Sequence, residues 1–210
     1  MNAHFRAVLF DCDGVLQRPA NDWMGEIGTL TGLTGSALDS FLDDISSVEQ
    51  PVLDGSEPYA VPLAAVLAEW DLTVPVADLL QVWQHLSVDA DMLDAARRLR
   101  AEGLVCGLGT NQHRERGAYM RRELGYERIF DPIVISSEIG VAKPDPGFFT
   151  RAVERLGVPA SSVLFVDDVQ ANVEGARSVG IVAEHFAKDG GRPELDRILA
   201  LHGLAEPVAA

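Results

Sequence analysis

Strand-like and helix-like segments alternate along the second half of the chain, and this alternation restricts the fold more than any other feature. Apolar runs of strand length occur at 104–108, 133–135, 163–166 and 181–183, after a first run at 7–10. Segments with helical spacing of apolar residues separate or follow them, at 92–99, 114–124, 148–156, 172–179 and 193–201. Strands joined by single helices are typical of a parallel, doubly wound sheet with right-handed crossovers. We therefore predict an α/β fold with a Rossmann-like core.

The segment 17–89 has a different pattern. Apolar residues recur there at helical spacing in 23–30, 38–45, 63–70 and 76–83, and no strand pattern interrupts this stretch. We expect residues 1–16 and 90–210 to form the α/β core, with residues 17–89 inserted as a small helical unit after the first strand. Residues 19–96 contain 14 Asp and Glu and no Lys or Arg. We interpret the tryptophans of this unit as packing residues, namely Trp23, Trp70 and Trp83.

The composition argues against several classes of protein. A net charge of −15 leaves no basic face for a nucleic acid. No apolar run approaches the roughly 18 residues that a membrane helix needs, and the first residues lack a signal-peptide pattern. Cys12 and Cys106, the two cysteines, lie in or beside predicted strands and indicate reduced thiols. We expect a cytoplasmic protein that binds neither nucleic acid nor membranes, and the sequence does not indicate its oligomeric state.

Polar residues follow four of the predicted strands. In chain order they are Asp11 and Asp13, Thr110 and Asn111, Lys143, and Asp167 and Asp168. Each alone has an ordinary explanation, such as a helix N-cap, a turn or a solvated cation. For Lys143 the explanation as a solvated cation is weakened by residue usage, because the chain has 15 Arg but two Lys and an incidental cation would more often be Arg. Pro144 and Pro146 also stiffen the backbone after Lys143. Since ligands bind at the carboxyl ends of parallel strands, the four strand ends together predict one site.

These residue types suit phosphoryl transfer. Carboxylates placed close together ionise only if a cation lies among them, and with oxygen ligands alone the natural cation is Mg²⁺. A lysine and a hydroxyl group nearby suit the remaining oxygens of a phosphoryl group. One carboxylate can attack phosphorus, and a second one two residues along can protonate the leaving oxygen and later activate water.

The same residues resemble the four motifs of the haloacid dehalogenase-like superfamily, in order. The matching stretches are Asp11-Cys12-Asp13-Gly14-Val15, Thr110, Lys143-Pro144-Asp145, and Asp167-Asp168 followed by Asn172. The double aspartate of the last stretch is similar to one branch of subfamily IA. The resemblance covers the predicted core, somewhat over half of the chain.

The resemblance implies a role for each residue that would act on the substrate. Asp11 would be the nucleophile, and Asp13 the general acid and base. Thr110, Asn111 and Lys143 would bind the phosphoryl group, and Lys143 would also take part in catalysis. The substrate implied is a small phosphorylated metabolite.

The resemblance also implies a magnesium site and a cap. Mg²⁺ would be held by Asp11, by the backbone carbonyl of Asp13 and by Asp168, with Asp167 as an alternate ligand or a neighbour of the ligands. Asn172 would orient these groups. The inserted helices would form a cap that closes over the site, and the absence of basic residues there argues against a second phosphate on the substrate.

The implied function is a Mg²⁺-dependent phosphatase that hydrolyses a phosphate monoester through an aspartyl-phosphate. A phosphomutase of the β-phosphoglucomutase kind would use the same motifs and differ mainly in its cap. A 2-haloacid dehalogenase works without metal and lacks the second aspartate, so Asp13 and Asp168 disfavour it. A receiver-type signalling module would place its acidic pair before the accepting aspartate, which contradicts the order here. An inactive phosphate-binding module is the non-enzymatic alternative.

Three further residues lie beside the motif loops and are candidate substrate contacts or surface residues, namely Arg18, His113 and Arg114.

Overall fold

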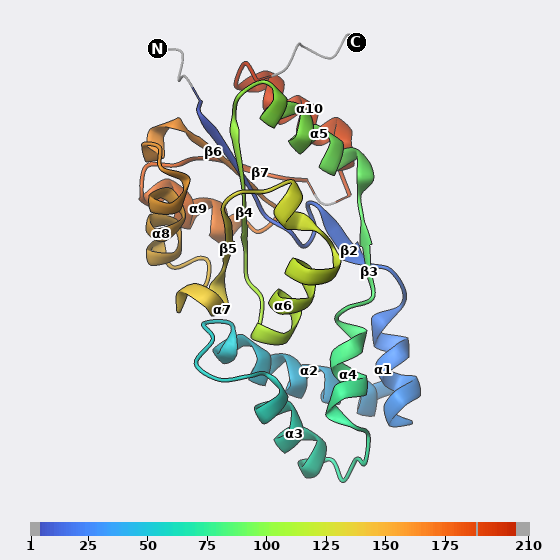
Figure 1. Ribbon diagram of the computed structural model, residues 1–210. Helices are drawn as coiled ribbons and strands as arrows, with labels where there is room; N and C mark the ends of the chain where they lie inside the picture. Colours follow the sequence, from blue (N-terminus) through green and yellow to red (C-terminus); the bar gives the residue numbers. More distant parts are fainter. Residues whose placement is uncertain (1–4, 188, 205–210) are drawn as a thin grey trace.

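The centre of the molecule is a five-stranded sheet in which every strand is parallel to its neighbours, in the order β5-β4-β1-β6-β7 (Figure 1). The computed structural model describes residues 5–187 and 189–204. The strands of the sheet are β1 Ala7–Phe10, β4 Val105–Thr110, β5 Ile133–Ile135, β6 Val163–Asp167 and β7 Val182–His185. Phe10 lies beside both Leu108 and Val166, so β1, β4 and β6 end side by side. The predicted doubly wound α/β fold is confirmed.

Helices cover both faces of this sheet, because successive residues of a strand point to opposite faces. Val8 and Phe10 of β1 pack in the core shared with α5, α6 and α10, whereas Ala7 and Leu9 pack in the core shared with α8 and α9. The helices outside the inserted segment are α5 Ala90–Ala101, α6 Arg114–Glu123, α7 Ser136–Ile139, α8 Pro146–Leu156, α9 Gln170–Ser178 and α10 Gly191–Leu201, with 3₁₀ turns at Tyr126–Arg128 and Ala160–Ser162. Burial on both faces explains why β1 and β6 consist almost entirely of apolar residues.

The inserted segment contains four helices with an apolar core of their own. They are α1 Trp23–Thr31, α2 Gly35–Val52, α3 Ala60–Glu69 and α4 Val76–Val82. Each contains most of one predicted range, and α2 extends well beyond the predicted 38–45 at its carboxyl end. Phe41, Tyr59 and Leu63 are among the fully buried residues that they share. In Figure 1 these helices lie beyond the lower edge of the sheet, where the strands end. The inserted helices therefore face the edge at which the site is predicted.

Two expectations about local structure are wrong. A pair of short antiparallel strands, β2 Gln17–Pro19 and β3 Leu86–Val88, interrupts the segment that was expected to contain helices alone. They join the inserted helices to the core. Their sequences, Gln17-Arg18-Pro19 and Leu86-Ser87-Val88, contain no continuous apolar run that would indicate a strand. No helix is predicted between the strand at 133–135 and the helix at 148–156, but residues 136–139 form the single turn α7 directly after β5.

The described residues include no helix long and apolar enough to cross a membrane. Cys12 and Cys106 are both buried and form no disulfide, in line with the predicted reduced thiols. The expectation that the chain begins without a signal peptide concerns mainly residues 1–4, which lie outside the described part of the chain.

Candidate active site

The predicted polar residues meet at the carboxyl edge of the sheet, facing the inserted helices. Asp11 follows β1 directly, Thr110 is the last residue of β4, and Asp167 is the last residue of β6. A cavity of about 400 Å³ opens at this edge, and its lining includes Asp11, Asp13, Thr110, Asn111, Lys143, Asp168 and Asn172. Asp167 is fully buried behind this lining. The structure thus brings all the predicted residues together.

Lys143 is a buried cation between two carboxylates. Its Nζ donates to Oδ1 of Asp11 at 2.6 Å and to Oδ2 of Asp167 at 2.7 Å. Burial alone would lower the pKa of Lys143, but the two carboxylates outweigh burial and hold the pKa above its usual value. The side chain of Asn111 fixes the backbone of Lys143, since it accepts from the Lys143 amide at 2.8 Å and donates to the Lys143 carbonyl at 2.9 Å. A charged ammonium group is therefore held at a defined point of the cavity.

Hydrogen bonds fix the orientation of Asp167. The amide of Val169 donates to its Oδ1 at 2.8 Å, and Nδ2 of Asn172 lies 3.0 Å from each of its two oxygens. Together with Lys143, these donors engage both oxygens of the carboxylate. In this arrangement Asp167 orients Lys143, and Asn172 orients Asp167.

Three carboxylates lie close enough to share one cation. Oxygens of Asp11, Asp167 and Asp168 all lie within 4.8 Å of one another. Burial raises the pKa of Asp11 to about 8, although Lys143 acts in the opposite direction. Burial, followed by the charge of Asp167, also raises the pKa of Asp168. A hard divalent cation would favour the ionised form of these groups, so this set of oxygen donors fits Mg²⁺.

Gly14 makes room for Asp168. Its φ is +82°, a conformation that residues with a side chain rarely adopt, and a Cβ at this position would lie 2.2 Å from Oδ2 of Asp168. The glycine after Asp13 therefore allows the loop after β1 to approach the Asp168 carboxylate closely.

The carboxylate of Asp13 is held by three side chains that the sequence analysis missed. Arg116 pairs with it through two nitrogens, Nη2 to Oδ1 at 2.7 Å and Nη1 to Oδ2 at 3.1 Å. Gln17 donates to Oδ1 at 3.0 Å, and Gln112 donates to Oδ2 at 2.6 Å and to Oγ1 of Thr110 at 2.9 Å. Gln112 precedes α6 and Arg116 lies in its first turn. Their closeness to Thr110 in the sequence indicates that they lie near the site but does not indicate their contact with Asp13.

Arg18 and His113, two of the three candidate substrate contacts, have different surroundings in the structure. Arg18 lines the cavity and pairs with Asp189 at 3.1 Å. His113 is buried, and its Nδ1 caps the start of α6 through the amide of Arg116. Of these two, Arg18 is the one that can reach a ligand in this cavity.

The start of α6 also contacts the inserted helices. Arg114, the third candidate contact, donates to the carbonyl of Gly55. The carboxylate of Glu115 accepts from the amides of Tyr59 and Ala60 at 3.3 and 3.2 Å, at the beginning of α3. A helix N-terminus is a favourable place for a carboxylate, so these contacts attach the inserted unit to α6 next to the site.

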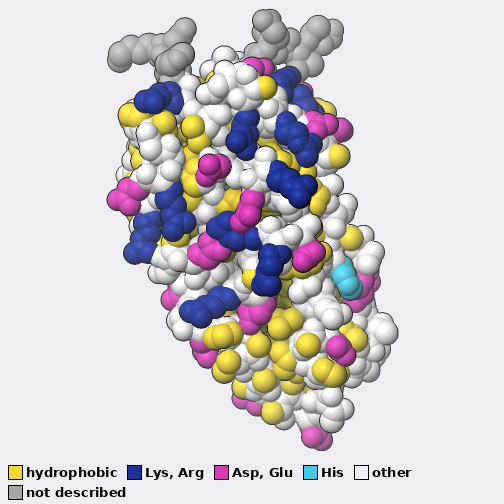
Figure 2. Space-filling model, in the orientation of Figure 1, with side chains coloured by type: hydrophobic (Ala, Val, Ile, Leu, Met, Phe, Trp, Pro, Cys, Tyr) yellow, Lys and Arg dark blue, Asp and Glu magenta, His cyan; other side chains and the backbone are white. Residues whose placement is uncertain are grey.

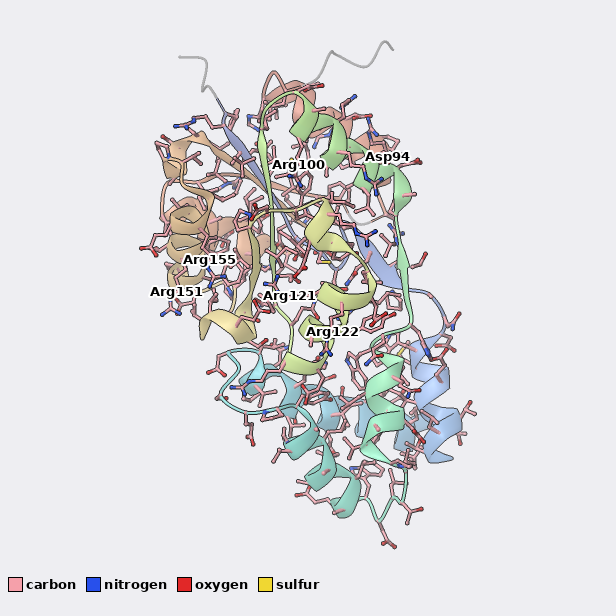
Figure 3. The ribbon with its side chains drawn as sticks, in the orientation of Figure 1. Asp94, Arg100, Arg121, Arg122, Arg151 and Arg155 are labelled. Atoms are coloured by element: carbon pink, nitrogen blue, oxygen red, sulfur yellow. The ribbon has the colours of Figure 1, made fainter. Side chains whose placement is uncertain are left out.

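Replacing Lys143 by methionine is expected to lower the free energy of unfolding by about 3–5 kcal/mol, because Asp11 and Asp167 would be left as neighbouring buried carboxylates without a cation. Urea denaturation at pH 7 in EDTA measures the change. Arg155→Met is a matched control, because Arg155 is an exposed cation on α8 (Figure 3). A loss below about 1 kcal/mol, typical of exposed ion pairs, would contradict the buried arrangement.

Comparisons with known proteins identify a family and a fold that this chain shares. The family model of haloacid dehalogenase-like hydrolases matches residues 5–180. Phosphatase MT3486 of Mycobacterium tuberculosis (strain CDC 1551 / Oshkosh) is 31% identical over 199 residues, which cover 88% of each chain. The (S)-2-haloacid dehalogenase of Pseudomonas putida is 29% identical over 119 residues, 56% of this chain and 52% of that protein. A HAD family enzyme from Bacteroides thetaiotaomicron, solved as a magnesium complex, shares the fold with a TM-score of 0.74 at 20% identity, covering 88% of this chain and 94% of that one.

Proposed function

The chain belongs to the haloacid dehalogenase-like hydrolases, and on this basis we propose that it is a Mg²⁺-dependent phosphatase acting on a small phosphorylated metabolite. One observation carries the proposal: the carboxylates of Asp11 and Asp13 and the ammonium group of Lys143 line the same cavity. A nucleophilic carboxylate such as Asp11 beside a cation such as Lys143 could take part in several kinds of reaction. A second carboxylate two residues along suits a reaction that must first protonate an alcohol and then deprotonate water.

The proposed reaction has two steps. In the first, an oxygen of Asp11 bonds to phosphorus, the bond between phosphorus and the alcohol oxygen breaks, and Asp13 gives its proton to that oxygen. In the second, water attacks the phosphorus of the aspartyl-phosphate and passes a proton to Asp13, the bond to Asp11 breaks, and phosphate leaves. Lys143 and Thr110 bind the oxygens that do not react, and Asn111 keeps Lys143 in place.

Asp11, Asp168 and the backbone carbonyl of Asp13 are the groups that we propose as holders of Mg²⁺. Bound there, the ion offsets the negative charge of the phosphoryl oxygens. Asp167 already accepts hydrogen bonds from Lys143, Val169 and Asn172. These bonds support a role in orienting Lys143 rather than a role as the principal Mg²⁺ ligand.

EDTA is expected to lower the hydrolysis of p-nitrophenyl phosphate about 10²- to 10³-fold, which corresponds to the several kcal/mol of charge stabilisation that a metal ion contributes. Excess Mg²⁺ should restore the rate, which absorbance of p-nitrophenolate measures. Circular dichroism in EDTA controls for loss of the fold. A rate that EDTA leaves unchanged would contradict the magnesium site.

We further propose that residues 17–89 act as a cap on a core made of residues 1–16 and 90–210. The separate apolar core of α1–α4, the stem formed by β2 and β3, and the contacts with α6 support this division. The free thiols of Cys12 and Cys106 favour a reducing compartment, and on that ground we propose a cytoplasmic location.

A panel of phosphate monoesters with Mg²⁺ tests the proposed function. Release of inorganic phosphate is the expected result. Release of chloride from 2-chloropropionate without metal would instead identify a dehalogenase. Conversion of a hexose 1-phosphate to the 6-phosphate without net phosphate release would identify a phosphomutase, and phosphate binding without any turnover would identify a binding module.

A further inference from the structure

A second cavity, of about 320 Å³, adjoins the one that contains Asp11 and Lys143. Asp13 and Pro19 line both cavities. Most other walls of the second cavity come from the inserted unit, including Trp23, Glu49 and Trp83, and Arg116 of α6 completes the core side. In a phosphate monoester the bridging oxygen must lie beside Asp13 to receive its proton. With the phosphoryl group in the first cavity, the alcohol part therefore extends into the second.

The second cavity offers an anionic alcohol no Lys or Arg that lacks a carboxylate partner. Arg116 is the one Lys or Arg among its lining residues, and its two terminal nitrogens pair with Asp13, which leaves Nε without a partner among the described residues. Residues 19–96 contain neither Lys nor Arg. Figure 2 agrees on the face it shows, where the dark blue side chains gather over the core. The imidazole of His85 also lines the cavity, and its Nδ1 is engaged by Glu26 at 2.9 Å.

Glu49 of α2 brings a carboxylate to this cavity, with His113 and Arg116 nearby. Its side chain is 19% exposed, and its Oε1 lies 3.8 Å from Nε2 of His113, which is too far for a hydrogen bond. That nitrogen is buried and has no hydrogen-bond partner among the described residues, and the same holds for Nε of Arg116. Burial raises the pKa of Glu49, although the charges of His113 and Arg116 act in the opposite direction. Glu49 and Arg116, which both line the cavity, thus offer an acceptor and a donor, and a further donor, Nε2 of His113, lies 3.8 Å from Glu49.

The remaining wall is aromatic. The rings of Trp23 and Trp83 lie 6.5 Å apart between centroids and are tilted by 47°. Such rings suit a ligand with apolar faces, whereas the polar groups nearby suit hydroxyls at its edge. At about 320 Å³ the cavity is at the small end of the usual range of about 300–1,000 Å³, so it fits one ring better than a long chain.

We propose that the second cavity binds the alcohol part of the substrate, and that Glu49 selects an uncharged, hydroxylated ring over alcohols that carry a carboxylate or a second phosphate. The proposal rests on the phosphatase function proposed above and adds the chemical class of the leaving group. Repulsion by Glu49 disfavours anionic alcohols, and its hydrogen bonds favour hydroxyls.

The test compares kcat/KM of the whole chain with Mg²⁺ for glucose 6-phosphate, 2-phosphoglycolate and farnesyl phosphate. Glucose 6-phosphate should exceed the other two by about 10- to 100-fold, the range for a hydrogen bond to a charged group. p-Nitrophenyl phosphate reports whether the phosphatase site works at all. If it is hydrolysed while glucose 6-phosphate has no advantage, the assignment of the leaving group is wrong and the phosphatase stands. If no ester is hydrolysed, both proposals fail.

Variants of Glu49 test the residue itself. Glu49→Gln keeps the size and removes the charge, and should lower the ratio of kcat/KM for glucose 6-phosphate to that for 2-phosphoglycolate by about tenfold. Glu49→Lys should lower this ratio further, because it attracts the carboxylate. Glu69→Gln is the matched control, an exposed carboxylate on α3, and should keep the ratio within about twofold. A ratio that neither Glu49 variant changes would overturn the role of Glu49.

Discussion

Asparagine in place of Asp11 is expected to abolish hydrolysis of p-nitrophenyl phosphate, with kcat lowered on the order of 10⁶-fold, the scale seen when a covalent nucleophile is removed. The amide has nearly the shape of the carboxylate and still faces Lys143, but its oxygen carries no charge and does not attack phosphorus. Burial opposes the ionised form of Asp11 by raising its pKa to about 8. A neutral amide is therefore tolerated there, and the variant should remain folded.

Steady-state rates and acid-quenched protein test this expectation together. Wild-type protein is quenched with acid during turnover of an aryl phosphate that is labelled in its phosphoryl group. It should carry the label on one aspartate, whereas the Asp11→Asn variant should carry none. Asp94→Asn is the control, because Asp94 is an exposed carboxylate on α5 (Figure 3). A loss below about 10²-fold, or label in the variant, would contradict the assignment of the nucleophile.

The convergence of the site could be predicted from the sequence because the geometry of a parallel sheet determines it. Once 7–10, 104–108 and 163–166 are identified as parallel strands, their carboxyl ends lie at one edge. Asp11, Thr110 and Asp167 then lie along that edge, although more than 150 residues separate the first from the last. They meet because β4 and β6 are the two neighbours of β1. Lys143 could be added because lysine is rare in this chain and two prolines follow it closely.

Features that depend on pairing between distant short segments could not be predicted. The strands β2 and β3 have three residues each and form only because the two ends of the inserted segment return to the same place. The role of Asn111 was only partly visible, since its side chain bonds to the backbone of Lys143, which no residue pattern encodes. The contact of Arg116 with Asp13 depends on how α6 leaves β4 and on the rotamer of a long side chain.

The contact between Arg116 and Asp13 affects the residue that we propose as general acid and base, because both oxygens of Asp13 already accept hydrogen bonds. Each oxygen accepts from one nitrogen of Arg116 and from one glutamine, either Gln17 or Gln112. The same carboxylate lies between the cavity for the phosphoryl group and the cavity that we assign to the alcohol. Four donors occupy the acceptor sites of this carboxylate, so at least one of these contacts must break before Asp13 can carry the proton that it gives to the bridging oxygen of a monoester.

Asparagine in place of Asp13 is expected to lower kcat/KM for an alkyl phosphate such as glucose 6-phosphate by about 10²- to 10⁴-fold, the usual contribution of general acid–base catalysis. For p-nitrophenyl phosphate the leaving phenolate needs no proton, so the first step should survive and only attack by water should be slow. Rapid mixing should then show a burst of one p-nitrophenolate per protein followed by slow turnover, with Asp94→Asn as the control. A dehalogenase, which lacks this aspartate, has no such requirement. Equal losses in kcat/KM for alkyl and aryl esters, without a burst, would show that Asp13 only supports the structure through its contact with Arg116. That outcome would remove the requirement for a general acid and base, which is the argument that distinguishes a phosphatase from a dehalogenase here.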